Sequence, residues 1–181
     1  MSVGLYIHVP FCRRRCHFCA FCLRIHREDQ AQAYLESLTR EIQIHAALNS
    51  LRGRRPDTVY FGGGTPTTLR PDQLCSALEL VRNCFGMQED VEVTVEAHPD
   101  TVTAEGLRTL VRAGFNRISF GLQSLDNREL VSTGRKTLGE SARVAVALAR
   151  AAGFVNINLD LIYGLPGQTF DSWLSTMEET I

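Results

Sequence analysis

The stretch YIHVPFCRRRCHFCAFC, residues 6–22, joins the first apolar run of the chain to four cysteines. Cys12, Cys16, Cys19 and Cys22 fall within eleven residues, and such close neighbours cannot all be core side chains. Closely spaced thiolates are the ligands that soft metals and iron–sulfur clusters prefer. We therefore expect this stretch to hold a metal centre, for which the rest of the chain forms a scaffold.

The cysteine spacing favours an iron–sulfur cluster over a zinc ion. A structural zinc site usually draws pairs of cysteines from separate knuckles, whereas these four thiols lie in one short loop. Even in ferredoxins with a similarly tight run, the fourth cysteine ligates a different cluster. We predict a [4Fe-4S] cluster on Cys12, Cys16 and Cys19 with one iron left open. Cys22 is a spare thiol, a substitute ligand or a mere neighbour of the cluster. The alternative to an iron–sulfur protein is a zinc-stabilised barrel without redox chemistry.

The composition is that of an ordinary globular protein and excludes some partners. The chain has 181 residues, a formal net charge of −1 and 22% charged residues. No apolar run approaches the ~20 residues that cross a bilayer, so no membrane span is expected. The near-neutral charge gives no argument for nucleic acid. Six cysteines without a secretory signal indicate a reducing compartment, and we predict a cytoplasmic protein.

Strand-like runs alternate with segments of helical periodicity along the whole chain. We expect strands at residues 3–9, 58–61, 91–97, 117–122 and 155–162. Helices are expected at residues 29–51, 71–85, 104–113, 138–152 and from 170 to the end. Repeated β–α units of this kind imply parallel strands with right-handed crossovers.

The predicted strands alternate between apolar and polar side chains. A parallel sheet covered on both faces should be almost wholly apolar, so this alternation is informative. Because side chains alternate with a period of two, one face of the sheet is polar in nearly every strand. A curved sheet with a polar interior explains the pattern, and such an interior needs a polar ligand. The polar positions include Tyr6, His8, Glu96, Ser119, Gln123, Asn158 and Asp160.

The length limits the size of this barrel. A full eight-unit barrel takes about 250 residues, or roughly 30 per unit. The chain has room for about six units, and it ends at Ile181 inside a helical pattern. We predict an α/β fold: a parallel, partial TIM-like barrel truncated after about five units. It would be one domain, residues 1–181, from which a C-terminal part is missing.

Several motifs resemble one known family. The pattern Cys12-x3-Cys16-x2-Cys19 resembles the signature of the radical S-adenosylmethionine (radical SAM) superfamily. Four further segments resemble the oxygen-independent coproporphyrinogen III oxidase family, which includes the haem chaperones. The resemblance covers essentially the whole chain. These segments are YIHVPFC at 6–12, FGGGTP at 61–66, GLQS at 121–124 and DLIYGLPGQT at 160–169.

The resemblance implies a partial (β/α)6 barrel and a cofactor pair. The open iron would chelate the amino and carboxylate groups of S-adenosylmethionine. Reduction by a low-potential electron donor would then release a 5′-deoxyadenosyl radical. The protein's part in such chemistry is binding, orientation and electrostatics.

The glycine run after the second strand is a candidate backbone site. Glycines let a backbone approach a ligand closely and present its N–H and C=O groups. The Lys-Ser/Thr ending of a phosphate loop is missing, and a plain tight turn is the alternative. By resemblance, Gly63, Gly64 and Thr65 contact the methionyl end of the cofactor, with Tyr6 and Phe18 beside it.

Charged and polar residues at the strand ends complete the predicted site, as in other barrels. Glu96 would bind the cofactor ammonium, or else pair with Arg117 or another barrel arginine. Gln123 and Asp160 are placed for the ribose hydroxyls. Arg135 would pair with the cofactor carboxylate, or it is a solvated loop arginine. His98 either contacts a ligand or is a core histidine whose hydrogen bonds are met within the protein. Arg13–Arg15 either form a solvated basic loop or attract an anionic ligand.

Two departures from the oxidase pattern bear on function. The oxidases carry a further cysteine two residues after the third cluster ligand, where this chain has Phe21. They also have an N-terminal extension before the first strand. Both features favour the haem chaperone branch, which binds haem and delivers it to an acceptor haemoprotein without decarboxylating coproporphyrinogen. The alternative is an enzyme: a porphyrinogen-decarboxylating oxidase, a haem-degrading enzyme, or a C-methyltransferase or cyclopropanase.

Overall fold

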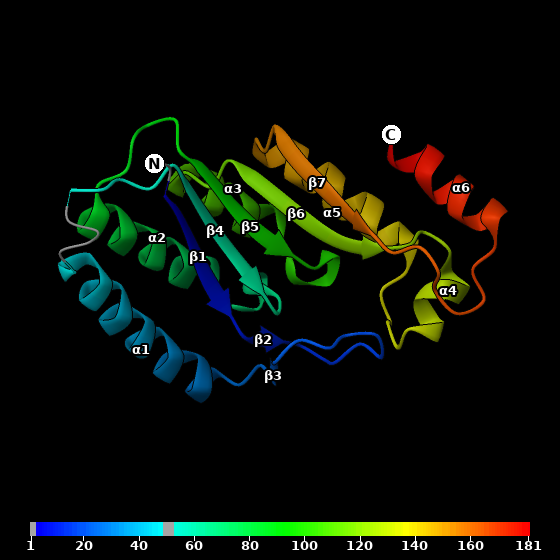
Figure 1. Cartoon of the computed structure of the whole chain (residues 1–181). Coiled ribbons are helices and arrows are strands. Elements are labelled where there is room, and N and C mark those ends of the chain that lie inside the picture. Colours follow the sequence, from blue (N-terminus) through cyan, green and yellow to red (C-terminus); the bar gives the residue numbers. More distant parts are fainter. Residues whose placement is uncertain (1–2, 49–52) are drawn as a thin grey trace.

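A five-stranded parallel sheet forms the centre of the computed structural model, which describes residues 3–48 and 53–181 (Figure 1). Every strand pairing in this sheet is parallel. Because the strands lie side by side in chain order, each crossover advances by one strand, as in a barrel wall. The strands, in this order, are β1 (Gly4–Val9), β4 (Thr58–Gly63), β5 (Glu92–Ala97), β6 (Arg117–Gln123) and β7 (Asn156–Leu161).

Helices cover one face of the sheet and leave the other face open (Figure 1). Helix α2 packs between α1 and α3, and α3 also packs against α5. Thr103 caps the start of α3 with a hydroxyl that accepts a hydrogen bond from the Gly106 N–H, and the left-handed Gly114 caps its end. The helices are α1 (Glu28–Ala47), α2 (Pro71–Phe85), α3 (Ala104–Ala113), α4 (Asn127–Ser132), α5 (Gly139–Ala152) and α6 (Phe170–Thr180).

The alternating pattern of the strands sorts their side chains between these two faces. The apolar set, which includes Phe61, Val95 and Phe120, is buried in the core. The polar set, which includes Tyr6 and Glu96, lies on the opposite face. The predicted parallel α/β sheet with one polar face is therefore confirmed, and its polar face is available to a ligand.

Most predicted elements are present, with several short additions. The predicted helix at 29–51 begins at Glu28 and ends at Ala47, and its expected last residues, 49–51, lie outside the described part of the chain. The additions are helix α4, the 3-10 helices η1 (Pro66–Thr68) and η2 (Pro99–Thr101), and a two-stranded sheet of β2 (Phe11–Cys12) and β3 (Arg24–Ile25). Such short segments carry too few residues for a period to show. No described helix is long and apolar enough to cross a membrane.

Candidate functional site

The cysteine loop is closed at its base and tied to the barrel edge. Strand β2 pairs with β3 in parallel, and the His26 N–H donates to the Cys12 carbonyl over 2.9 Å. Within the loop, the Cys19 N–H donates to the Cys16 carbonyl over 3.2 Å. The His17 N–H donates to the Thr133 carbonyl over 2.9 Å, which anchors the loop to the segment after α4. The loop therefore crosses the open end of the sheet, from β1 towards β6.

Two of the other loop thiols, Cys16 and Cys19, lie close enough to Cys12 to affect its pKa. Burial raises the pKa of Cys12, a hydrogen bond with Thr65 lowers it, and the neighbouring Cys19 and Cys16 raise it further. The Cys12 Sγ lies 3.4 Å from the Thr65 Oγ1. These three thiols are half-buried, whereas Cys22 is exposed. The structure thus gathers Cys12, Cys16 and Cys19 and leaves Cys22 at the surface.

The arrangement of the thiols suits a cluster. Within residues 3–48 and 53–181, no three His, Cys, Asp or Glu side chains are placed to hold a single metal ion. A cubane cluster takes each cysteine at a different iron, so its sulfur ligands stand farther apart than those of one tetrahedral zinc ion. Three half-buried thiols on a single short loop fit that donor set.

The glycine loop after β4 packs tightly against the segment that carries Cys12. The Gly64 N–H donates to the Val9 carbonyl over 2.8 Å, and the Thr65 N–H donates to the Phe11 carbonyl over 2.7 Å. Gly63 has φ of +113°, and a β-carbon there would lie 2.6 Å from the His8 ring. A β-carbon at Gly64 would lie 2.6 Å from the Phe11 carbonyl oxygen. The protein's own packing therefore demands these glycines.

Glu96 lies beside this loop on the polar face of the sheet. Its carboxylate accepts hydrogen bonds from the Tyr60 hydroxyl over 2.7 Å and the Gly63 N–H over 3.0 Å. Burial raises its pKa, the two hydrogen bonds oppose that rise, and nearby Asp160 adds to it. The alternative ion pair with Arg117 is not formed, since Arg117 instead donates to Thr94 Oγ1 over 3.4 Å. Glu96 is thus free to receive a cationic group.

Sequence reasoning missed Tyr60 as a partner of Glu96. Tyr60 also stacks on Tyr6, with ring centroids 5.8 Å apart. Its position two residues before Gly62 on the same strand places it on the polar face, so the period of two could have identified it.

Gln123 and Asp160 lie at the carboxyl ends of adjacent strands. The β6–β7 register shifts between Gly121 and Gln123, and Gln123 has φ of +72°, a left-handed conformation that is uncommon outside glycine. Asp160 accepts hydrogen bonds from the Ser119 hydroxyl over 3.0 Å and the Asn158 amide over 2.7 Å. The two predicted ribose-binding residues therefore share one edge of the polar face.

Arg135 is buried, so the alternative of a solvated loop arginine is wrong. Its side chain is 7% exposed, and its Nη1 donates to the carbonyls of Gly121 and Leu122 over 2.7 and 2.9 Å. Burial lowers its pKa, while Cys16 raises it. The guanidinium thus lies between the end of β6 and Cys16 of the cysteine loop.

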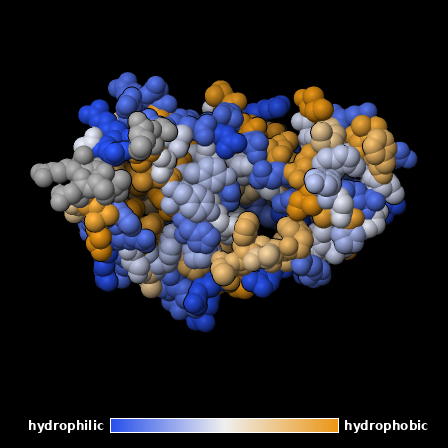
Figure 2. Space-filling view, in the orientation of Figure 1, coloured by the Kyte–Doolittle hydropathy of each residue, from blue (hydrophilic) through white to orange (hydrophobic). Residues whose placement is uncertain are grey.

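The two aromatic residues predicted beside the cofactor remain accessible. Tyr6 is 59% exposed on the polar face, and Phe18 is 41% exposed on the cysteine loop. Figure 2 shows hydrophilic side chains at the centre of the open face and a more apolar strip below it, where the cysteine loop runs. The surface therefore offers apolar and polar contacts next to one another.

His98 caps a short helix, η2 (Pro99–Thr101). Its Nδ1 accepts a hydrogen bond from the Asp100 N–H over 3.2 Å. Burial, with the nearby Arg135, lowers the pKa of His98 to about 4, so the ring is neutral at pH 7. Arg13 donates to the Asp100 carbonyl over 2.6 Å, so this loop arginine is partly engaged by the barrel. These contacts favour the reading of His98 as a satisfied structural histidine.

Comparison with known proteins shows the family to which the chain belongs. A sequence profile of the Radical SAM superfamily matches residues 6–180. The chain is 33% identical over 182 residues to the protein named heme chaperone HemW of Haemophilus influenzae, covering 99% of this chain and 48% of that one. It is 35% identical over 178 residues to the oxygen-independent coproporphyrinogen III oxidase of Escherichia coli, covering 97% and 38%.

The solved structures agree with this grouping. The coproporphyrinogen III oxidase HemN of Escherichia coli, described as a radical SAM enzyme, superposes with a TM-score of 0.90 and 34% identity over 99% of this chain and 41% of that one. The chain spans less than half the length of these relatives. It belongs to the radical SAM superfamily, among relatives that are named as haem chaperones and oxygen-independent coproporphyrinogen III oxidases.

Proposed function

We propose that this chain is the cluster- and S-adenosylmethionine-binding core of a haem chaperone, which binds haem and passes it to an acceptor haemoprotein. Residues 1–181 would form a single barrel domain of that protein. A cytoplasmic location belongs to the proposal because thiols that bind a cluster need a reducing compartment.

In this proposal, the residues along the open face of the sheet bind the cluster and S-adenosylmethionine. Cys12, Cys16 and Cys19 hold the [4Fe-4S] cluster, which with S-adenosylmethionine supplies one-electron chemistry when a low-potential donor is present. Glu96 and the backbone around Gly63 receive the ammonium group, and Arg135 receives the carboxylate. The remaining contacts come from Tyr6, Phe18, Gly64, Thr65, Gln123 and Asp160.

Phe21 is the residue that supports assignment to the haem chaperone branch. It stands where the oxidase pattern has its additional cysteine, and it is 65% exposed on the cysteine loop. A phenyl ring can supply neither a thiol nor a proton at that point. Cys22, one residue later, is exposed, whereas Cys12, Cys16 and Cys19 are half-buried.

A catalytic oxidase is the second candidate function. The observation that favours it is the superposition on the Escherichia coli oxidase at a TM-score of 0.90 with 34% identity. In that case the same site would act on coproporphyrinogen III by oxidative decarboxylation. The difference between the two candidates is chemical, because only an oxidase converts propionate side chains to vinyl groups.

The anaerobically reconstituted protein should therefore bind haem and transfer it without producing vinyl groups. Haem binding is followed by absorbance titration, and transfer by the spectrum of an apo-haemoprotein added afterwards. In parallel, the protein is incubated with coproporphyrinogen III, S-adenosylmethionine and a low-potential reductant, and the products are separated by mass. Vinyl products would overturn the chaperone assignment in favour of the oxidase, and failure to bind haem would contradict it directly.

A further inference from the structure

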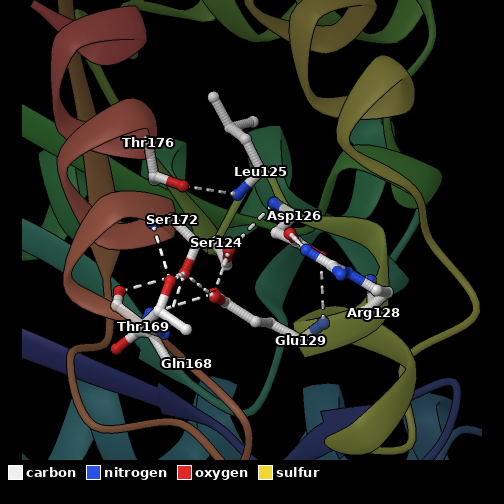
Figure 3. Close-up of polar contacts among 9 residues, drawn as sticks. All are labelled: Ser124, Leu125, Asp126, Arg128, Glu129, Gln168, Thr169, Ser172 and Thr176. Carbon is white, nitrogen blue, oxygen red and sulfur yellow. Dashed lines mark hydrogen bonds and ion pairs between the residues drawn. The ribbon is translucent and has the colours of Figure 1, made fainter.

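A buried carboxylate lies beneath the strand edge that bears Gln123 and Asp160. Glu129, on helix α4, is 3% exposed and is surrounded by the end of β6, the loop after β7 and the start of α6 (Figure 3). We propose that Glu129 is a positioning residue for S-adenosylmethionine: it locks these segments together and thereby fixes Gln123 and Arg135. This inference rests on the proposed function, because it assigns a role within the same cofactor site.

Glu129 receives hydrogen bonds from three separate segments. Its Oε2 accepts from the Ser124 hydroxyl over 2.6 Å and from the Gln168 amide over 2.9 Å. Its Oε1 accepts from the Ser172 hydroxyl over 2.5 Å. Ser124 follows β6, Gln168 lies in the loop after β7, and Ser172 is in the first turn of α6. One side chain therefore joins parts of the chain that are more than forty residues apart.

The contacts continue from Glu129 to Gln123. The Gln168 Oε1 accepts from the Gly164 N–H over 2.6 Å, while its Nε2 also reaches the Ile162 carbonyl at 3.4 Å. The Ile162 N–H in turn donates to the Gln123 carbonyl over 2.9 Å. Since Gln123 has a left-handed backbone, this hydrogen bond helps to hold an otherwise unfavourable conformation.

A second path leads from Glu129 to Arg135. The Arg135 N–H donates to the carbonyl of Leu130, the next residue of α4, over 3.1 Å. Helix α4 has only six residues, so its own hydrogen bonds cannot fix it in place. Fixing α4 through Glu129 therefore also fixes the backbone of Arg135, from which the buried guanidinium extends.

The three hydrogen bonds that Glu129 accepts require a carboxylate at this position. An ionised carboxylate has only acceptor sites and can receive three donors at once, whereas an amide presents its NH2 to one of them. All three donors are neutral, and none of the ion pairs in the described chain includes Glu129. Burying a polar group is costly unless hydrogen bonds satisfy it, so this arrangement is rigid only when all three donors are present.

Glu129→Gln should weaken S-adenosylmethionine binding while the cluster remains. We expect an affinity about 10-fold lower, the size typical when a group that orients a ligand residue is lost. Binding is measured by titrating S-adenosylmethionine into the reduced, reconstituted protein and following the change in the cluster's EPR signal. Iron and sulfide content should equal those of the wild type. Glu140→Gln, which removes an exposed carboxylate from α5, is the matched control and should bind normally.

The double variant Glu129→Gln/Gln168→Glu separates positioning from simple destabilisation. It returns one carboxylate and one amide to the same pair in reversed order, and it should recover a large part of the lost affinity. Should Glu129→Gln not fold, Ser172→Ala removes one donor only and should weaken binding a few-fold. Wild-type affinity in Glu129→Gln, or in Ser172→Ala where it is needed, would overturn this inference alone. A wild-type protein that holds its cluster but does not bind S-adenosylmethionine would overturn the proposed function and this inference with it.

Discussion

Replacing Cys12, Cys16 or Cys19 by alanine should remove the iron–sulfur cluster in each case, whereas Cys22→Ala should keep it. The three thiols are half-buried on a loop that is anchored to the barrel edge, and Cys16 and Cys19 affect the pKa of Cys12, whereas Cys22 is exposed. A cubane that loses one of three protein ligands retains too few thiolates to stay bound. Iron and sulfide per chain, together with the visible absorption after anaerobic reconstitution, measure the outcome.

Cys22→Ala is the matched control for these variants because it removes a thiol from the same loop. Circular dichroism should show that all four variants keep their helices and strands, since the core of the sheet does not involve the cysteine loop. Equal iron loss in all four variants would contradict the three-ligand assignment. Full iron content in any one of the first three would contradict it as well.

Glu96→Gln should weaken S-adenosylmethionine binding about 10- to 150-fold. The carboxylate has two neutral donors, Tyr60 and Gly63, and no arginine partner among the described ion pairs and hydrogen bonds. A hydrogen bond to a charged group contributes about 1.5–3 kcal/mol, which corresponds to that range. Glu92→Gln, on the exposed start of the same strand, is the control and should leave binding unchanged.

The same carboxylate should give binding a pH dependence. Burial raises the pKa of Glu96 above its ordinary value of 4.5. Only the ionised form attracts an ammonium group, so the affinity should fall as the pH is lowered through that raised pKa. The folded state holds this proton more tightly than the unfolded state, so the Glu96 contribution to the free energy of unfolding decreases as pH rises from 4.5 through the raised pKa. Glu96→Gln should abolish both dependences, and an unchanged pH profile would contradict this role.

Much of the fold could be predicted because it depends on repeated local patterns. The alternation in β5 and β6 identified a sheet with one polar face, and the β–α repeats identified its parallel order. Helix α4 and the β2–β3 pair could not be predicted, since they are too short to show a period. They form because distant segments hold them, through contacts such as that of His17 with Thr133.

The site was predictable where residue type alone restricts the chemistry. Closely spaced thiols and a carboxylate on a polar strand face indicate a candidate ligand site directly, as with Cys12 and Glu96. Glu129 gave no such signal because its partners, Ser124 and Ser172, meet only in the folded chain. Arg135 was ambiguous for the same reason, since its burial depends on carbonyl groups at the end of β6.

The central claim is that three cysteines leave one iron of a [4Fe-4S] cluster open to S-adenosylmethionine. Its most direct test is EPR of the reduced, anaerobically reconstituted protein before and after S-adenosylmethionine is added, with metal analysis of the same sample. We predict about four irons and four sulfides per chain and a spectrum that changes when S-adenosylmethionine is added. Zinc in place of iron, or a cluster whose spectrum does not respond, would contradict the account.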